Sequence, residues 1–303
     1  MHSTHSTLRV SCPMCKSTQA HELCALGYTD AQVLSFLQTY YKNTVDESYL
    51  EEMNYAIHQC TSCGSCYQKE ILNGEGMALL YGKWISPESS KKKVVNIQRQ
   101  IELARHIGRI LLLFPKPNKA HLLDYGMGWG DWCHMAQSFG FSACGVELDQ
   151  DRIDFARNRG IKAYLPDDLP EGPYDFIYLE QVLEHLPEPY EVLQKLVGSL
   201  NTNGYLHIAV PNASSVAKEA RKNPLSLLKK GPAQPLEHIN SFSHDSLVTF
   251  MKQFDCHPAA QKEMFLRCTS PRLLLRDSLL MCARFLPATI FPHKTSLLFQ
   301  KRT

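Results

Sequence analysis

The hydrophobic positions between residues 120 and 210 form short apolar runs that alternate with amphipathic segments. Short runs bounded by glycine, proline and polar residues are typical of buried strands, and apolar residues every three to four positions indicate helices. Strands are therefore expected at 121–125, 142–147, 162–165, 174–179 and 204–210, with helices at 131–139, 149–159 and 187–200. This alternation predicts an α/β fold with a parallel sheet and helices on both faces.

Patterned segments also flank this region. Apolar residues at helical spacing from Val94 to Leu111 predict an amphipathic helix that Pro115 and Pro117 end. A loop rich in proline and lysine is expected at 223–235. Beyond it the pattern predicts a helix at 243–254, a strand at 262–268, a helix at 271–285 and a last strand at 295–301.

Composition narrows the function classes. The chain has 303 residues, of which 44% are hydrophobic and 20% charged, and this excludes a disordered protein. The net charge is −4 over residues 1–82, +7 over 83–119, −9 over 120–215 and +8 over 216–303. Because these blocks make no single basic stripe, a dedicated nucleic-acid binder is disfavoured. The sequence shows no secretory signal and no apolar run of about 20 residues, so we expect no membrane span and a cytoplasmic location.

Two CxxC pairs stand near the N-terminus, Cys12 with Cys15 and Cys60 with Cys63, separated by a mostly helix-compatible stretch of 44 residues (16–59). Two such pairs can surround one structural Zn²⁺ with four thiolates. The alternative is four reduced thiols without metal. Cys24 and Cys66 are spare, and Cys66 could replace Cys63 if the turn differs.

The most informative motif follows the expected strand at 121–125. Asp124 is followed by Gly126, Gly128 and Gly130, and then by the expected helix. Glycines permit the tight turn with positive φ and let a ligand approach the bare main chain. Glu147 ends the next expected strand, where an acid can bind ribose hydroxyls. A P-loop is excluded because no GK[ST] follows.

A third motif, YDFIYLEQVLEHL at 174–186, follows in order. Together the three motifs resemble those of class I S-adenosylmethionine-dependent methyltransferases, in the branch that includes ubiquinone and sugar methyltransferases. The resemblance covers roughly residues 95–303. It implies a Rossmann-like sheet of seven strands, six parallel and the last antiparallel, with 295–301 as that last strand. The cysteine pairs resemble the zinc-binding N-terminal module of some members.

The resemblance implies roles for residues at matching positions. Asp124 and the backbone of the three glycines, Gly126, Gly128 and Gly130, would hold the methionine and ribose portions of S-adenosylmethionine. Glu147 would accept hydrogen bonds from the ribose 2′- and 3′-hydroxyls.

The rest of the cofactor site follows in the same way. Leu148 would pack on the adenine face. The adenine amino group would be bound by Asp167 or Asp168, between which the sequence LPDD leaves the register open. Glu180 and Gln181 would lie beside the methionine end.

Three residues are candidates for catalysis. Glu237 and His238 lie in a stretch, PLEHINSFS, that resembles the segment over the acceptor pocket in sugar and small-molecule members. His185 lies in the third motif. A histidine has the right unperturbed pKa to act as a base near neutrality. The alternative for His185 and His238 is a structural role, in which each holds backbone through hydrogen bonds.

The sequence thus predicts a zinc-binding module at 1–82, a helical connector or cap at 83–118, and a methyltransferase domain at 119–303 with an acceptor-binding insertion at about 213–242. The expected reaction is methyl transfer from S-adenosylmethionine to a small molecule, with a sugar or another biosynthetic intermediate as first choice. One alternative is an RNA methyltransferase whose zinc module docks nucleic acid. Another is a binding protein that keeps the cofactor without turnover. The oligomeric state stays open.

Overall fold

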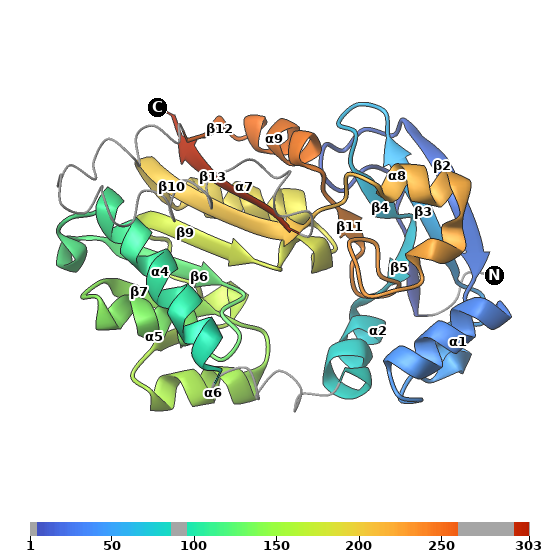
Figure 1. The fold of residues 1–303 in the computed structure, drawn as a ribbon, viewed down its shortest axis with the longest axis horizontal. Coiled ribbons are helices and arrows are strands. Elements are labelled where there is room, and N and C mark those ends of the chain that lie inside the picture. Colours follow the sequence, from blue (N-terminus) through green and yellow to red (C-terminus); the bar gives the residue numbers. More distant parts are fainter. Residues whose placement is uncertain (1–4, 86–95, 260–293, 303) are drawn as a thin grey trace. The chain divides into compact units, whose positions relative to one another are not determined.

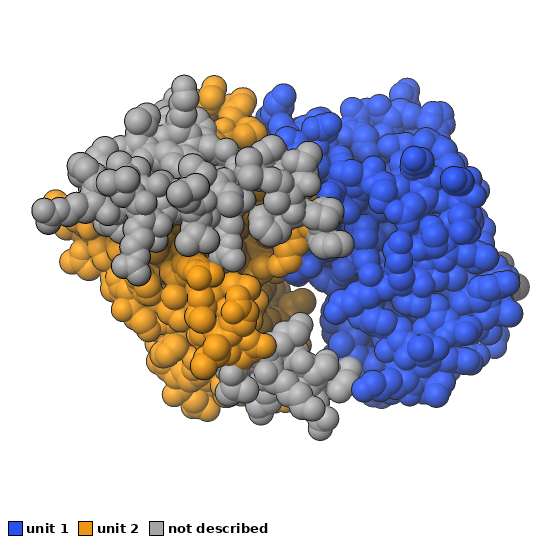
Figure 2. All heavy atoms as spheres, in the orientation of Figure 1, with its two compact units in different colours: residues 1–89, 181–194, 210–253 blue, residues 90–180, 195–209, 254–303 orange. Residues whose placement is uncertain are grey.

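The computed structural model describes residues 5–85, 96–259 and 294–302 and divides the chain into two compact units (Figure 1). Unit 1 comprises residues 1–89, 181–194 and 210–253, and unit 2 comprises residues 90–180, 195–209 and 254–303, coloured separately in Figure 2. Residues 210–253 therefore belong to the same compact unit as the N-terminal residues. The boundaries at 82 and 118 and the acceptor-binding role of 213–242 stay predictions.

Unit 2 is built around a sheet of seven strands in the order β12-β13-β10-β9-β6-β7-β8. The strands are β6 (His121–Tyr125), β7 (Ser142–Val146), β8 (Lys162–Tyr164), β9 (Tyr174–Glu180), β10 (Leu200–Pro211), β12 (Cys256–Pro258) and β13 (Lys294–Lys301). The pairs β10–β9, β9–β6, β6–β7 and β7–β8 are parallel, whereas β12 and β13 are antiparallel. In Figure 1 the β13 arrow runs opposite to that of β10. The predicted Rossmann-like fold is confirmed.

Three helices of unit 2 accompany these strands: α4 (Ile97–Leu113), α5 (Asp131–Ser138) and α6 (Gln150–Asn158). A further helix, α7 (Pro189–Gly198), begins in unit 1 and ends in unit 2. Two have side-chain caps at their first turns: Asn96 accepts a hydrogen bond from the Arg99 N–H, and Asp149 accepts from Asp151 and Arg152. Such caps satisfy N–H groups that lack partners inside the helix. They fix where each helix begins, as does the left-handed Gly130 before α5.

The core of unit 2 lies between the sheet and its helices. Leu122 and Leu123 of β6 are fully buried, as expected for a strand covered on both faces. The Trp132 ring of α5 stacks on Tyr178 of β9 at a centroid distance of 4.8 Å, and its Nε1–H donates to His106 of α4. Trp132 therefore ties two helices to the central strands.

Unit 1 contains a four-stranded sheet in the order β11-β4-β3-β2 and a separate β1–β5 pair. Its strands are β1 (Ser6–Leu8), β2 (Ala20–Gly27), β3 (Asn54–Cys60), β4 (Cys66–Gln68), β5 (Glu70–Leu72) and β11 (Asn240–Ser241). Its helices and helical turns are α1 (Ala31–Tyr40), η1 (Glu47–Tyr49), α2 (Gly74–Leu79), η2 (Leu80–Trp84), η5 (Leu183–His185), α8 (Val216–Lys222), η6 (Pro224–Leu227) and α9 (His244–Lys252).

The stretch between the cysteine pairs differs from its prediction. Residues 16–59 were expected to be mostly helix-compatible, but β2 and β3 pair antiparallel there and enclose α1. The half-buried pattern of β2 explains the difference, because only one face of an antiparallel sheet needs to be apolar. α8 was not predicted. The strand expected at 262–268 and the helix expected at 271–285 lie outside the described residues.

Most other predicted bounds agree within a few residues. β6 has the predicted ends, and β13 begins one residue earlier than predicted. β10 begins four residues before its predicted start, with an irregular register against β9 between Leu200 and Tyr205. Within the described part of the chain, the helices lack the length and apolar character needed to cross a membrane.

Candidate functional site

The glycine turn in unit 2 joins β6 to α5. Gly126, Gly128 and Gly130 adopt φ values of +83°, +56° and +79°, where side chains are disfavoured. A Cβ added at Gly130 would lie 2.8 Å from Ile161 Cδ1, so this glycine permits close packing. A Cβ added at Gly128 would meet nothing within 4 Å. The middle of the turn therefore presents bare main chain to open space.

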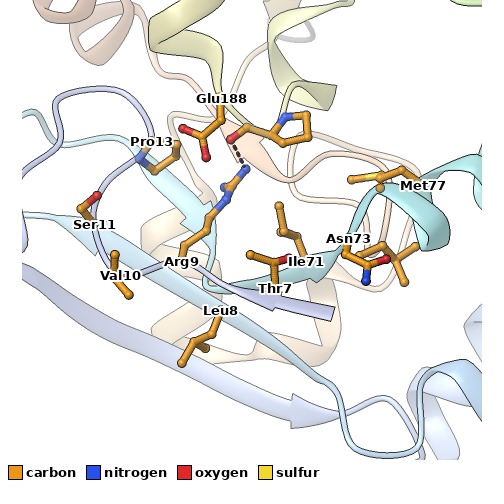
Figure 3. Close-up of a pocket in the computed structure, with 13 residues that line it drawn as sticks. Thr7, Leu8, Arg9, Val10, Ser11, Pro13, Ile71, Asn73, Met77 and Glu188 are labelled. Carbon is orange, nitrogen blue, oxygen red and sulfur yellow. Dashed lines mark hydrogen bonds between the residues drawn. The ribbon is translucent and has the colours of Figure 1, made fainter. Parts of the chain in front are cut away.

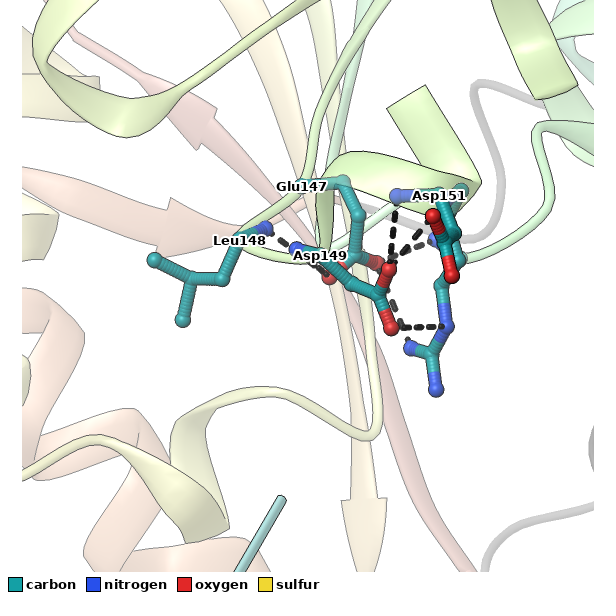
Figure 4. A network of polar contacts seen from close by, with 6 residues as sticks. Glu147, Leu148, Asp149 and Asp151 are labelled. Atoms are coloured by element: carbon teal, nitrogen blue, oxygen red, sulfur yellow. Dashed lines mark hydrogen bonds and ion pairs between the residues drawn. The ribbon is translucent and has the colours of Figure 1, made fainter. Parts of the chain in front are cut away.

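Glu147, just beyond β7, faces this turn. Its Oε2 accepts a hydrogen bond from the Gly128 N–H at 2.9 Å, and its Oε1 accepts from the Leu148 N–H at 2.8 Å. Arg152 lies 3.6 Å from the carboxylate, and Asp149 begins α6 beside it (Figure 4). The predicted ribose-binding acid and the predicted turn thus lie together within unit 2.

Two further carboxylates lie at the ends of the central strands. Asp124 of β6 is 4% exposed, and burial, reinforced by Glu180, raises its pKa well above the ordinary value. Glu180 ends β9 and binds the Lys294 ammonium and the Tyr178 hydroxyl, each at 2.8 Å. Burial acts to raise the pKa of Glu180, but Lys294, Tyr178 and Arg99 outweigh it and lower the pKa to about 2. Glu180 is therefore ionised at neutral pH, next to a carboxyl whose ionisation is disfavoured.

The remaining predicted cofactor residues are at the surface or at the unit boundary. Leu148 is 74% exposed, so most of its side chain is accessible to a ligand. Asp167 and Asp168 form the exposed turn η4 (Pro166–Asp168) after β8. Gln181 follows Glu180 directly, has φ of +57° and is the first residue of the second segment of unit 1.

The catalytic candidates lie together in unit 1. The rings of His185 and His238 are edge-to-face, with centroids 4.8 Å apart. His185 Nδ1 donates to the Glu237 carbonyl at 2.9 Å, and His238 Nδ1 donates to the Gly231 carbonyl. Glu184 is buried next to His185, with 4.0 Å between its Oε1 and His185 Nε2. Residues 231–238 and 184–185 thus converge from two distant segments.

Burial sets the charge of this group. It lowers the pKa of His185 to about 3 and that of His238 to about 4, so both imidazoles are neutral at pH 7. The pKa of Glu237 is raised by burial, against hydrogen bonds from Tyr41 and Gln234. The Tyr41 hydroxyl donates to Glu237 Oε1 at 2.9 Å.

Residues that the sequence did not single out complete the cluster. The Tyr81 hydroxyl lies 3.1 Å from His185 Nδ1. Arg9 is buried and donates to the Pro187 and Ile239 carbonyls and to Asn240 Oδ1. No local pattern marks these residues, because their partners lie 104 to 231 positions away in sequence. Only the tertiary structure identifies these residues as part of the site.

The two CxxC pairs also converge in unit 1. The sulfurs of Cys12, Cys15, Cys60 and Cys63 all lie within 4.8 Å of one another, with Cys12–Cys63 at 3.7 Å and Cys15–Cys60 at 3.5 Å. A tetrahedral Zn²⁺ with Zn–S bonds of about 2.3 Å places its sulfurs about 3.8 Å apart, so the four residues fit this ion. The Cys12 thiol lowers the pKa of Cys63 to about 5.

The two spare cysteines are not part of this group. Cys66 is buried in β4, and burial raises its pKa to about 12. Cys24 is half-buried in β2, and burial raises its pKa as well.

A separate cavity of about 370 Å³ lies in unit 1 between β1, β5 and the segment at 187–188. Arg9 and Glu188 line it, as Figure 3 shows. None of the predicted site residues belongs to its lining. This cavity is therefore not part of the predicted site.

The fold, the glycine turn and the placement of Glu147 can now be set beside known proteins. A family model described as "Methyltransferase domain" matches residues 96–261, more than half of the chain. The chain belongs to this family of S-adenosylmethionine-dependent methyltransferases. A comparison with curated protein sequences found no match.

The chain is similar, at low sequence identity, to solved structures of several methyltransferases. Magnesium protoporphyrin IX methyltransferase from Synechocystis PCC 6803, with bound S-adenosylhomocysteine, is 13% identical with a TM-score of 0.47, over 70% of this chain and 86% of that one. The 1,6-didemethyltoxoflavin-N1-methyltransferase of Burkholderia thailandensis is 16% identical with a TM-score of 0.46, over 80% and 98%. The plantazolicin methyltransferase is 15% identical with a TM-score of 0.48, over 76% and 91%. Likenesses this distant say nothing of the acceptor used here.

Proposed function

We propose that the protein transfers the methyl group of S-adenosylmethionine to a small-molecule acceptor, with a sugar or another biosynthetic intermediate as the expected class. The observation that carries this proposal is the Glu147 carboxylate bound to the Gly128 N–H, at a turn whose middle glycine faces open space. Family membership supplies the reaction class.

The cofactor would lie along the ends of β6 and β7. The main chain of Gly126, Gly128 and Gly130 would face the methionine and ribose portions, with Asp124 beneath them. Glu147 would accept hydrogen bonds from the ribose hydroxyls, because its carboxylate is already held at the turn by main-chain donors. Bound there, S-adenosylmethionine would supply an electrophilic methyl group. The protein's part is to align donor and nucleophile and to exclude water.

We keep the adenine and methionine contacts that the sequence resemblance implies. Leu148 has an exposed side chain available to cover the adenine face. Asp167 or Asp168 would accept from the adenine amino group, and Glu180 and Gln181 would lie by the methionine end. The positive φ of Gln181 supports a specialised turn directly after β9.

For the acceptor we propose the group formed by Glu237, His238 and His185. If the acceptor loses a proton on methylation, His238 Nε2 can take it, because the Gly231 carbonyl fixes the proton on Nδ1. Glu237, held by Tyr41, would orient a hydroxyl of the acceptor or serve as the base itself. The Glu237 carbonyl in turn orients His185.

We also propose that Cys12, Cys15, Cys60 and Cys63 bind a structural Zn²⁺. The sulfur distances support this ion, and binding would replace thiol protons by a metal that stabilises the N-terminal residues. A closed site of four thiolates leaves no open position for chemistry. The nine free cysteines of the described residues are in keeping with the proposed cytoplasmic location.

A small-molecule acceptor is favoured over RNA by charge. Residues 1–82 carry 4 basic and 8 acidic side chains, and such a segment gains little from phosphate contacts. Incubation with radiolabelled methyl donor and separate small-molecule and RNA fractions of a cell extract decides between these acceptors. Label in the RNA fraction alone would overturn the proposal.

Calorimetric titration with S-adenosylhomocysteine tests the cofactor site. We expect the wild type to bind, and Glu147→Gln to bind roughly 10–150-fold more weakly, since a hydrogen bond to a charged group contributes about 1.5–3 kcal/mol. Glu171→Gln, an exposed acid in the same unit, is the matched control and should leave affinity unchanged. A wild type that does not bind the nucleoside would contradict the proposed function.

A further inference from the structure

Three electron-pair donors of unit 1 converge at one point. One ligand atom each from Glu184, His185 and His238 lie within 4.8 Å of one another. Glu184 is 1% exposed, whereas the His185 side chain is 24% exposed. The group is therefore buried on the carboxylate side and accessible on the His185 side.

The tautomers of both histidines follow from their partners. A carbonyl oxygen can only accept, so the proton of each ring must lie on the Nδ1 that contacts it. His185 Nδ1 contacts the Glu237 carbonyl and His238 Nδ1 contacts the Gly231 carbonyl. Each Nε2 therefore carries a lone pair. His185 Nε2 lies 4.0 Å from Glu184 Oε1, close enough for one cation to contact both atoms.

This arrangement is the one that metal-binding histidines usually show. Such a histidine donates its second N–H to a backbone carbonyl or a carboxylate, which fixes the ring and its tautomer. Two imidazole nitrogens and one carboxylate oxygen on one side of an ion form a known binding set for divalent transition metals. Three protein ligands would leave further coordination positions of such an ion for water or substrate.

The main chain around the group is held rigidly. Asn240 Nδ2 donates to the Leu183 and Leu186 carbonyls at 2.8 and 2.7 Å, and so brackets Glu184 and His185. Arg9 donates to Asn240 Oδ1 at 2.9 Å and to the Pro187 carbonyl at 3.0 Å. The two segments that supply the ligands are thus fastened to each other, which lowers the ordering cost of binding an ion.

We propose that Glu184, His185 and His238 form a second metal site, which binds a divalent transition-metal ion such as Zn²⁺, Co²⁺ or Ni²⁺ through His185 Nε2, His238 Nε2 and a Glu184 oxygen. It is distinct from the four-cysteine group, because the two share no residue. Its use in catalysis rests on the proposed function. An ion with an open position would bind an acceptor hydroxyl and lower its pKa, and Glu237 rather than His238 would then take the proton.

The test is a metal titration of the full chain. Protein stripped with a chelator is titrated with Co²⁺ while calorimetry counts the sites and the visible spectrum reports the ligands. We expect two equivalents, one with thiolate-to-metal absorption and one without. Glu184→Gln and His238→Ala should each weaken only the second site, by more than the roughly 10–100-fold that loss of an outer partner costs. Cys60→Ser should remove the equivalent with thiolate-to-metal absorption.

Controls separate folding from ligand loss. His244→Ala changes an exposed histidine of unit 1 outside the group and should keep both equivalents. In Glu184→Gln and His238→Ala, retention of the equivalent with thiolate-to-metal absorption shows that unit 1 still folds, and unchanged binding of S-adenosylhomocysteine shows the same for unit 2. One equivalent in the wild type, or a second equivalent that survives both variants, overturns the metal site. A wild type that binds two ions but no nucleoside would contradict the proposed function and leave the metal site standing.

Discussion

The glycine turn of unit 2 and the histidine group of unit 1 are built in opposite ways. The turn places main-chain atoms and two carboxylates, and all its residues lie within 24 positions, from Asp124 to Glu147. The histidine group places side chains, and its parts come from around residues 9, 81, 184 and 238. One site therefore depends on local backbone conformation, and the other on long-range contacts.

The difference shows what each region tolerates. A turn with positive φ is strained when a Cβ is added, whatever happens elsewhere in the chain. A group held by distant hydrogen bonds fails when any of the joined segments moves. We therefore expect substitutions in unit 1 to disturb residues far from the substituted position. Substitutions in the glycine turn should disturb only the turn itself.

Removal of the proposed zinc should give the largest effect. Cys60→Ser deletes one of four ligands, and in small zinc-dependent domains metal binding contributes on the order of 10 kcal/mol to folding. Hydrogen exchange should rise across β2 and β3 and also in the distant strand β11, which pairs with β4. Exchange in β6 and β7 should change far less.

Cys24→Ser is the matched control, because Cys24 lies in β2 outside the four-sulfur group. It should retain metal and exchange rates. Equal exchange in Cys60→Ser and wild type, with no zinc found by elemental analysis of either, would mean that the four thiols hold unit 1 without metal.

Two alanine substitutions in the turn should have intermediate effects that differ in kind. Gly130→Ala should lower the free energy of unfolding by about 3 kcal/mol, from backbone strain and from the contact with Ile161. Gly128→Ala should cost about 1 kcal/mol, since only strain is added, yet reduce S-adenosylhomocysteine affinity by more than Gly130→Ala does. Urea unfolding and calorimetry measure the two quantities.

Gly108→Ala serves as the control for these variants. Gly108 lies inside α4 with open space at its Cβ, so alanine should stabilise the helix by about 0.5–1 kcal/mol. If Gly128→Ala binds the nucleoside as tightly as the wild type, no ligand approaches the turn at that point.

The smallest expected effect is on the stability of unit 2 at acidic pH. Because the folded-state pKa of Glu180 is lowered to about 2, its contribution to stability is present above pH 4.5 and is lost as the pH falls toward 2. Glu180→Gln should remove that part of the pH dependence, worth less than about 1 kcal/mol because the partner Lys294 is half-exposed. Unfolding midpoints between pH 6 and 3 measure it, and parallel curves for variant and wild type would contradict the assignment.

Local signals predicted unit 2 well and unit 1 poorly. The alternation of strands and helices gave the bounds of β6 and the strand–turn–helix order around Gly126, because propensity and burial agree there. Side-chain partners such as Arg9 and Asn240, 231 positions apart, leave no trace in a local pattern. The paired cysteines were visible from their spacing, but β2 and β3 between them were not, because strands with one wet face carry a weaker apolar signal.

The pairing of Asn240 and Ser241 with Tyr67 and Cys66 bears on how the chain can be shortened. A truncated protein that began at residue 96, where the family match starts, would lose β4 and Arg9 together. Its residues 240–241 would then present an open strand edge beside His238, a template for aggregation. If such a fragment were inactive, the loss of β4 and Arg9 would explain the result, and the full chain could still be an active methyltransferase.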